Sequence, residues 1–232
     1  SSEAVPDVKQ IPPIVPLPQA SESPQQTLPS QAFAEKQTEP MVTGVAQPEA
    51  AAPSDGSVMR LPPVPVRSVV EKSRYGPLPK IAADGTRPSD VYARPASASG
   101  APGPGQPVRI ALLITNLGLS EVETTQAINA LPGPVSLAFG PYGRNLEGWV
   151  RQARDMGHEV MLQVPLEPFD YPDNDPGPHT LLTSLPPEEN MKRLHWIMSR
   201  FTGYTGITNH MGAKFTAAQE SFLPMLEEIK SR

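Results

Sequence analysis

Four short apolar segments lie in the second half of the chain, and each is followed by a turn and a helical pattern. They span residues 109–115, 135–141, 159–166 and 206–212. The first, RIALLIT, is aliphatic and β-branched without alternation, which is typical of a strand covered on both faces. Successive strand–helix units form parallel sheets, so the sequence predicts an α/β fold with a parallel sheet or with part of a parallel (β/α) barrel.

The helical patterns indicate how much of a complete fold this chain contains. They span residues 121–131, 145–157, 186–201 and 217–232, and Ser120 with Glu123 forms a capping box at the first of them. Four strand–helix units are about half of a closed barrel. We therefore expect residues 108–232 to be the N-terminal part of such a domain, in a protein that continues beyond Arg232.

The first half of the chain has a different composition. Twenty of the 31 prolines lie in residues 1–107, whereas 10 of the 13 aromatic residues follow them. Such a segment buries too little apolar surface to offset the entropy lost on ordering. We predict a disordered Pro-rich linker over residues 1–107. Two alternatives remain open: a polyproline ligand at 10–18 or 60–70, and a short docked strand or helix within 64–76.

The overall composition excludes several classes of protein. The net charge of −5 and the pI near 5.4 give no footprint of nucleic-acid binding. Cysteine is absent, so no disulfide framework or cysteine-based site exists. No apolar run approaches the roughly 18 residues that cross a membrane, so we expect no membrane span in this chain.

Active sites of parallel α/β folds lie at the C-terminal ends of the strands, an edge called the rim below. Polar residues follow each predicted strand: Thr115 and Asn116, then Tyr142 and Arg144, then Gln163 and Glu167, and finally Asn209, His210 and Lys214. Glu167 and His210 are the catalytic candidates, because a general base needs a titratable group near the attacked centre. The candidates for substrate binding are Asn116, Tyr142, Gln163 and Asn209.

Other notable side chains have structural interpretations. His158 is expected to order the turn before the third strand, and His195 and Trp196 to pack on a helix face. His179 falls in a loop that could cover the rim. The loop residues Phe169 and Tyr171, like Tyr142, are candidates for stacking on a sugar.

Three segments resemble the divergent polysaccharide deacetylase family. They are RIALLITNLGLS, PVSLAFGPYGRNLEGWVRQARDMGHEVMLQVPLEP and GITNHMGAKFT, between residues 109 and 216. The resemblance implies a (β/α) barrel, often incomplete, and an activity that hydrolyses N-acetyl or O-acetyl groups on carbohydrates. It also implies a divalent metal held by one Asp and two His, with a second Asp as the base.

This chain departs from that pattern at the expected metal site. Thr115 and Asn116 stand where the family has two acids, and Gln163 stands where it has a histidine. His210 in NHMG is the single expected metal ligand that keeps its type. Without the metal, the pKa of the attacking water molecule is not lowered toward about 7. We therefore expect no cofactor, or zinc if the protein is active.

These observations predict a carbohydrate-related domain that binds a glycan or a protein partner without metal-dependent catalysis. One alternative is an active hydrolase with an altered site that uses Glu167 and His210. The other is a structural interaction protein that works through its Pro-rich tail. The resemblance implies an envelope polysaccharide or peptidoglycan-related glycan as partner. It also implies a periplasmic or cell-envelope location, with an anchor in a segment absent from this chain.

Overall fold

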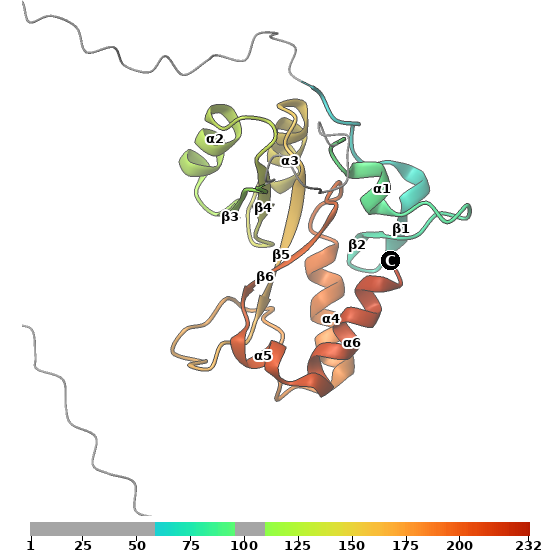
Figure 1. The fold of residues 1–232 in the computed structure, drawn as a ribbon. Helices are drawn as coiled ribbons and strands as arrows, with labels where there is room; N and C mark the ends of the chain where they lie inside the picture. Colours follow the sequence, from blue (N-terminus) through green and yellow to red (C-terminus); the bar gives the residue numbers. More distant parts are fainter. Residues whose placement is uncertain (1–58, 96–109) are drawn as a thin grey trace, which may run out of the picture. The chain divides into compact units, whose positions relative to one another are not determined.

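The computed structural model describes residues 59–95 and 110–232, and its centre is a four-stranded parallel sheet (Figure 1). The strands lie side by side in chain order: β3 (Leu113–Leu117), β4 (Ser136–Phe139), β5 (Val160–Leu166) and β6 (Gly206–Met211). This confirms the predicted α/β fold with a parallel sheet.

Helices follow the strands as the periodicity predicted: α2 (Glu121–Ala130), α3 (Leu146–Asp155), α4 (Pro187–Met198) and α6 (Gln219–Lys230). A short helix that was not predicted, α5 (Ala213–Ala217), lies between β6 and α6. The predicted N-cap of α2 is present, since the Ser120 hydroxyl accepts from the Glu123 N–H at 3.3 Å. Figure 1 shows α4 and α6 packed side by side. The core joins sheet residues such as Leu137, Phe139, Leu162 and Val164 to helix residues such as Val150, Ala153, Leu194 and Ile197.

The first strand is less buried than predicted. In the described part of the chain, β3 is an edge strand that pairs only with β4. Leu113 is 37% exposed and Ile114 is 38% exposed, whereas Leu117 enters the core. The expectation of a strand covered on both faces is therefore wrong for β3. An apolar run shows that a strand is able to be buried on both faces. Whether it is buried depends on the elements that pack against it.

Residues 59–95, which fall within the predicted disordered linker, are folded. They form η1 (Arg67–Val69), β1 (Val70–Ser73), β2 (Gly76–Pro79) and α1 (Pro88–Tyr92). Strands β1 and β2 pair as an antiparallel hairpin. Five apolar side chains of this segment are buried: Leu61, Val69, Leu78, Pro88 and Tyr92. The prediction of disorder is wrong for this segment, and the short docked element considered within residues 64–76 is present. The rest of the predicted linker, residues 1–58 and 96–107, lies outside the described residues.

A buried arginine joins this segment to the sheet domain. Arg154 of α3 is 1% exposed, and its Nε donates to the Pro62 carbonyl at 3.0 Å. Its Nη1 donates to the carbonyls of Tyr92 at 3.0 Å and Gly203 at 3.2 Å. Burial lowers the pKa of Arg154, and Tyr92 and Glu159 partly oppose that shift. The carbonyl oxygens offset part of the cost of burying the charge.

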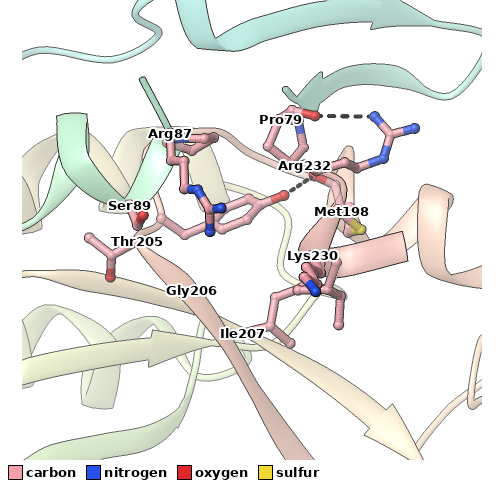
Figure 2. A pocket seen from close by; sticks show the side chains of 12 residues that line it. Pro79, Arg87, Ser89, Met198, Thr205, Gly206, Ile207, Lys230 and Arg232 are labelled. Carbon is pink, nitrogen blue, oxygen red and sulfur yellow. Dashed lines mark hydrogen bonds between the residues drawn. The ribbon is translucent and has the colours of Figure 1, made fainter. Parts of the chain in front are cut away.

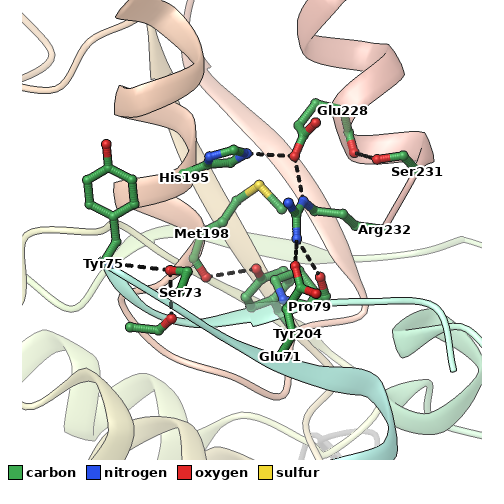
Figure 3. A network of polar contacts seen from close by, with 11 residues as sticks. Glu71, Ser73, Tyr75, Pro79, His195, Met198, Tyr204, Glu228, Ser231 and Arg232 are labelled. Atoms are coloured by element: carbon green, nitrogen blue, oxygen red, sulfur yellow. Dashed lines mark hydrogen bonds and ion pairs between the residues drawn. The ribbon is translucent and has the colours of Figure 1, made fainter. Parts of the chain in front are cut away.

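A second network joins the hairpin to the end of α6 (Figure 3). Arg232 donates to Glu71 at 2.7 Å, to the Pro79 carbonyl at 3.1 Å and to Glu228 at 2.5 Å. Glu228 also contacts His195 Nε2 at 2.6 Å. The folded segment of residues 59–95 is thus tied to α6 through its hairpin and to α3 through Pro62 and Tyr92.

Among the helices formed by residues 59–95 and 110–232, none has the length and apolar character needed to cross a membrane.

Candidate functional site

The ends of β3 and β5 bring Asn116 and Gln163 together. The register between β3 and β4 is irregular from Ile114 to Leu117, and Asn116 has φ of 64°, in the left-handed region that asparagine tolerates. The Asn116 N–H donates to Gln163 Oε1 at 2.5 Å, and Gln163 Nε2 donates to Asn116 Oδ1 at 3.2 Å. Two of the three predicted substrate-binding amides, Asn116 and Gln163, therefore lie at one point of the rim.

This amide pair is neutral and largely self-satisfied. Gln163 is 3% exposed, whereas Asn116 is exposed at the end of β3. Each end of the buried Gln163 amide has a partner on Asn116, which explains how a polar side chain is tolerated there. Gln163 Oε1 accepts from the backbone of Asn116, and Asn116 Oδ1 accepts from the side chain of Gln163.

Glu167 is held at the end of β5 by several groups. It is 2% exposed, and its Oε2 accepts from the Thr183 N–H at 2.5 Å and the Thr183 hydroxyl at 2.8 Å. Its Oε1 forms an ion pair with Lys214 Nζ at 2.8 Å. Burial alone would raise the pKa of Glu167, but the bonds from Lys214 and Thr183 outweigh it and lower the pKa.

A carboxylate with a lowered pKa and occupied oxygens is a weak proton acceptor. The backbone carbonyl of Glu167 also accepts from the N–H groups of Lys214 and Phe215, at 3.2 and 3.1 Å. Glu167 thus links β5, the loop that contains Thr183, and the start of α5. This geometry favours a structural role over the predicted catalytic one.

His210 lies on the same face of the sheet as Gln163. Thr208 pairs with Gln163 and His210 pairs with Pro165 across β5 and β6, and residues two apart share a face. The alternation places Asn209 on the opposite face, where its Nδ2 donates to the Met211 carbonyl at 2.7 Å. The register of β5 and β6 therefore places His210 on the sheet face that carries Gln163 and places Asn209 on the other face.

Tyr142 belongs to an aromatic cluster at the end of β4. Its hydroxyl accepts from the His179 N–H at 3.2 Å. The His179 ring stacks on Trp196 with 3.6 Å between centroids and 3° between planes. Burial lowers the pKa of His179, as do Arg193 and Arg200, and burial raises the pKa of Tyr142. Trp196 is half-buried against this loop residue, so its interpretation as a plain packing residue was incomplete.

Two histidines have the structural roles expected of them. His158 is fully buried, with its ring nitrogens 2.8 Å from the Val135 carbonyl oxygen and 3.0 Å from that of Ile128. His195 contacts Glu228 (Figure 3), away from the rim. Neither residue contributes to the candidate site.

The residues at the rim do not fit a catalytic zinc ion. Zinc sites use thiolate, imidazole and carboxylate ligands, and a catalytic site offers three of them. Within residues 59–95 and 110–232, no three His, Cys, Asp or Glu side chains are grouped closely enough to hold a metal. Asn116 and Gln163 supply neutral amide oxygens, which bind weakly without added carboxylates.

Two cavities flank the sheet at opposite ends. One, of about 240 Å³, lies between α1, the start of β6 and the end of α6, and Arg87, Thr205 and Lys230 line it (Figure 2). It lies at the N-terminal end of β6, where a parallel fold places no chemistry. The other, of about 400 Å³, lies at the rim and is lined by Tyr142, Arg144 and neighbouring residues.

Comparison with known proteins agrees with this architecture. YibQ, an uncharacterized protein of Escherichia coli K12, is 25% identical over 109 residues, which are 47% of this chain and 33% of YibQ. The crystal structure of the uncharacterized protein ATU2773 from Agrobacterium tumefaciens C58 is similar with a TM-score of 0.62 and 45% identity. That match covers 66% of this chain and 60% of ATU2773.

The chain thus spans about a third of the curated relative and 60% of the solved structure that it matches. A four-stranded parallel sheet is consistent with part of a deacetylase-type barrel. Residues 112–232 match the family model described as divergent polysaccharide deacetylase. Since this match extends over more than half of the sequence, the chain belongs to the divergent polysaccharide deacetylase family.

Proposed function

We propose that this domain binds a glycan of the cell envelope at its rim and does not hydrolyse it by metal-dependent chemistry. The observation that carries the proposal is the hydrogen-bonded pair of Asn116 and Gln163. These residues stand at the positions where the family resemblance implies an aspartate and a histidine. A periplasmic or cell-envelope location, implied by the same resemblance, is part of the proposal.

The chemistry of the amide pair supports loss of the metal. An asparagine in place of aspartate removes a negative charge beside the dication, and a glutamine in place of histidine removes a nitrogen ligand. Asn116 Oδ1 and Gln163 Oε1 already accept hydrogen bonds within the pair. His210 alone cannot hold a metal ion that would lower the pKa of a water molecule, because a catalytic site needs about three protein ligands.

The same groups suit recognition of a carbohydrate. An amide offers a donor and an acceptor on one rigid plane, which matches the mixed hydrogen bonding of sugar hydroxyls. The exposed Asn116 amide and the Tyr142 ring lie at the ends of neighbouring strands. The alternative of an altered hydrolase loses support because the oxygens of Glu167 are engaged by Thr183 and Lys214.

Calorimetric titration of the full chain with soluble glycans tests the proposal. The panel contains peptidoglycan fragments, an N-acetylglucosamine oligomer and an oligogalacturonate. Asn116→Gly deletes the amide and keeps the left-handed backbone, so we expect at least about tenfold weaker binding. Gln126→Ala, which removes an exposed amide on α2, is the control. Acetate release from an acetylated glycan that stops on adding a chelator would overturn the proposal.

A further inference from the structure

A cleft lies at the rim beside the amide pair, between the loops that lead into α2 and α3. Its volume is about 400 Å³. Six side chains line it: Leu119, Glu121, Tyr142, Arg144, Asn145 and Trp149. From this lining we infer that the α2–α3 cleft binds a neutral sugar unit of the glycan. The inference rests on the proposed function and adds to it a binding subsite and the chemical class of the ligand.

The walls of the cleft are fixed by a close approach of two loops. A Cβ added at Gly143 would lie 2.2 Å from the Gly118 carbonyl oxygen, so these two glycines pack backbone against backbone. Gly118 has φ of 96°, and its N–H donates to the buried Thr124 hydroxyl at 2.9 Å. The loop after β3 is thereby held against the loop after β4, and the cleft is formed before any ligand arrives.

Tyr142 is also fixed in place. Its hydroxyl accepts from the His179 N–H at 3.2 Å, and a Cβ added at Gly177 would lie 2.4 Å from its ring. A ring held by the loop of residues 175–180 loses little rotational freedom when a ligand stacks on it. The aromatic wall of the cleft is therefore preorganised.

The lining combines the two kinds of surface that a sugar presents. Leu119 and Tyr142 offer apolar surface for the C–H faces of a pyranose ring, whereas Trp149, which is 8% exposed, adds little to that surface. Glu121, Arg144 and Asn145 offer planar carboxylate, guanidinium and amide groups for pairs of hydroxyls. A concave site with apolar walls and a few polar groups is the usual form of a small-ligand site.

The charge of the lining indicates a neutral ligand. The one acid, Glu121, and the one base, Arg144, cancel in formal charge. Both side chains are exposed, and neither forms an ion pair or a side-chain hydrogen bond with another residue of the described ranges. Their polar atoms thus remain available, and neither an acidic nor a basic sugar is favoured over an uncharged one.

The cleft adjoins the amide pair along the chain. Leu119 follows Asn116 by three residues, and both lie where β3 ends. A glycan could therefore contact Asn116 with one sugar unit and the α2–α3 cleft with the next.

Titration of the full chain with a neutral N-acetylglucosamine oligomer tests this inference. The readouts are calorimetry and the fluorescence of the two tryptophans, one of which, Trp149, lines the cleft. Arg144→Ala and Glu121→Ala should each weaken binding at least about tenfold. Arg151→Ala, an exposed arginine of α3 outside the cleft, should leave the affinity unchanged. Thermal unfolding of each variant confirms that it is folded.

The outcomes separate this inference from the proposed function. Wild-type affinity in both cleft variants, with weaker binding in Asn116→Gly, would overturn the assignment of a sugar subsite to the α2–α3 cleft. The proposed function would still stand. Binding of an oligogalacturonate but not of the neutral oligomer would overturn the assigned sugar class. If the wild-type chain binds none of the glycans, the proposed function fails and the inference fails with it.

Discussion

Asn116 and Gln163 hydrogen-bond to each other at the rim although β4 lies between their strands. Two substitutions at these positions restore the residue types that the family resemblance implies. Asn116→Asp with Gln163→His places an anionic and an imidazole ligand on the sheet face that carries His210. We expect the double variant to bind Zn²⁺ at least about tenfold more tightly than the wild type, measured by competition with a chromogenic chelator.

Each single substitution is a control for this prediction, because two good ligands are fewer than a zinc site needs. Adding His210→Ala to the double variant should remove most of the gain. Equal zinc affinity with and without His210 would contradict its place in the same site.

Removal of the Arg154 guanidinium should destabilise the protein. Arg154→Met fills a similar volume but leaves the carbonyls of Pro62, Tyr92 and Gly203 without their donor. We expect the free energy of unfolding to fall by about 2 to 4 kcal/mol. Urea denaturation measures it, and Arg151→Met on the exposed side of α3 should change it by less than about 0.5 kcal/mol.

The ion pair of Glu167 should make stability depend on acidic pH. The pKa of Glu167 is lowered in the folded state, so the unfolded chain binds more protons and stability rises with pH there. The contribution is complete above the ordinary glutamate pKa of about 4.3. It is lost as the pH falls from that value through the lower folded-state pKa.

Urea denaturation of Glu167→Gln and the wild type at pH 7 and at successively lower pH checks this expectation. The variant should be less stable at pH 7, and the difference should shrink on acidification. Glu228, whose pKa is also lowered, retains its own acid dependence in both proteins. A difference in stability that stays constant down to strongly acidic pH would contradict the assigned ion pair.

Local patterns in the sequence were sufficient for most of the sheet and for one part of the site. The predicted strands and helices of residues 135–232 are present because apolar runs, caps and glycine stops act within a few residues of one another. The meeting of Asn116 and Gln163 followed from the rule that parallel strands end at one edge.

Contacts between distant residues account for what the sequence did not predict. Arg154 reaches Pro62 across 92 positions, and Lys214 reaches Glu167 across 47. Composition alone favoured disorder for residues 59–95. No local pattern reveals that the buried Arg154 donates hydrogen bonds to the backbone of this segment. The stacking of His179 on Trp196 is likewise a property of the folded loop and not of either segment alone.

The contacts of Arg154 show that the folded unit extends beyond the segment that matches the family model. The family match begins at residue 112, whereas the hydrogen bonds of this side chain begin at Pro62. The segment that matches the family model is therefore smaller than the segment that folds together. Substitutions in the Pro-rich stretch from Leu61 to Tyr92 act on the same packed interior as substitutions in the sheet, although no family signature marks them.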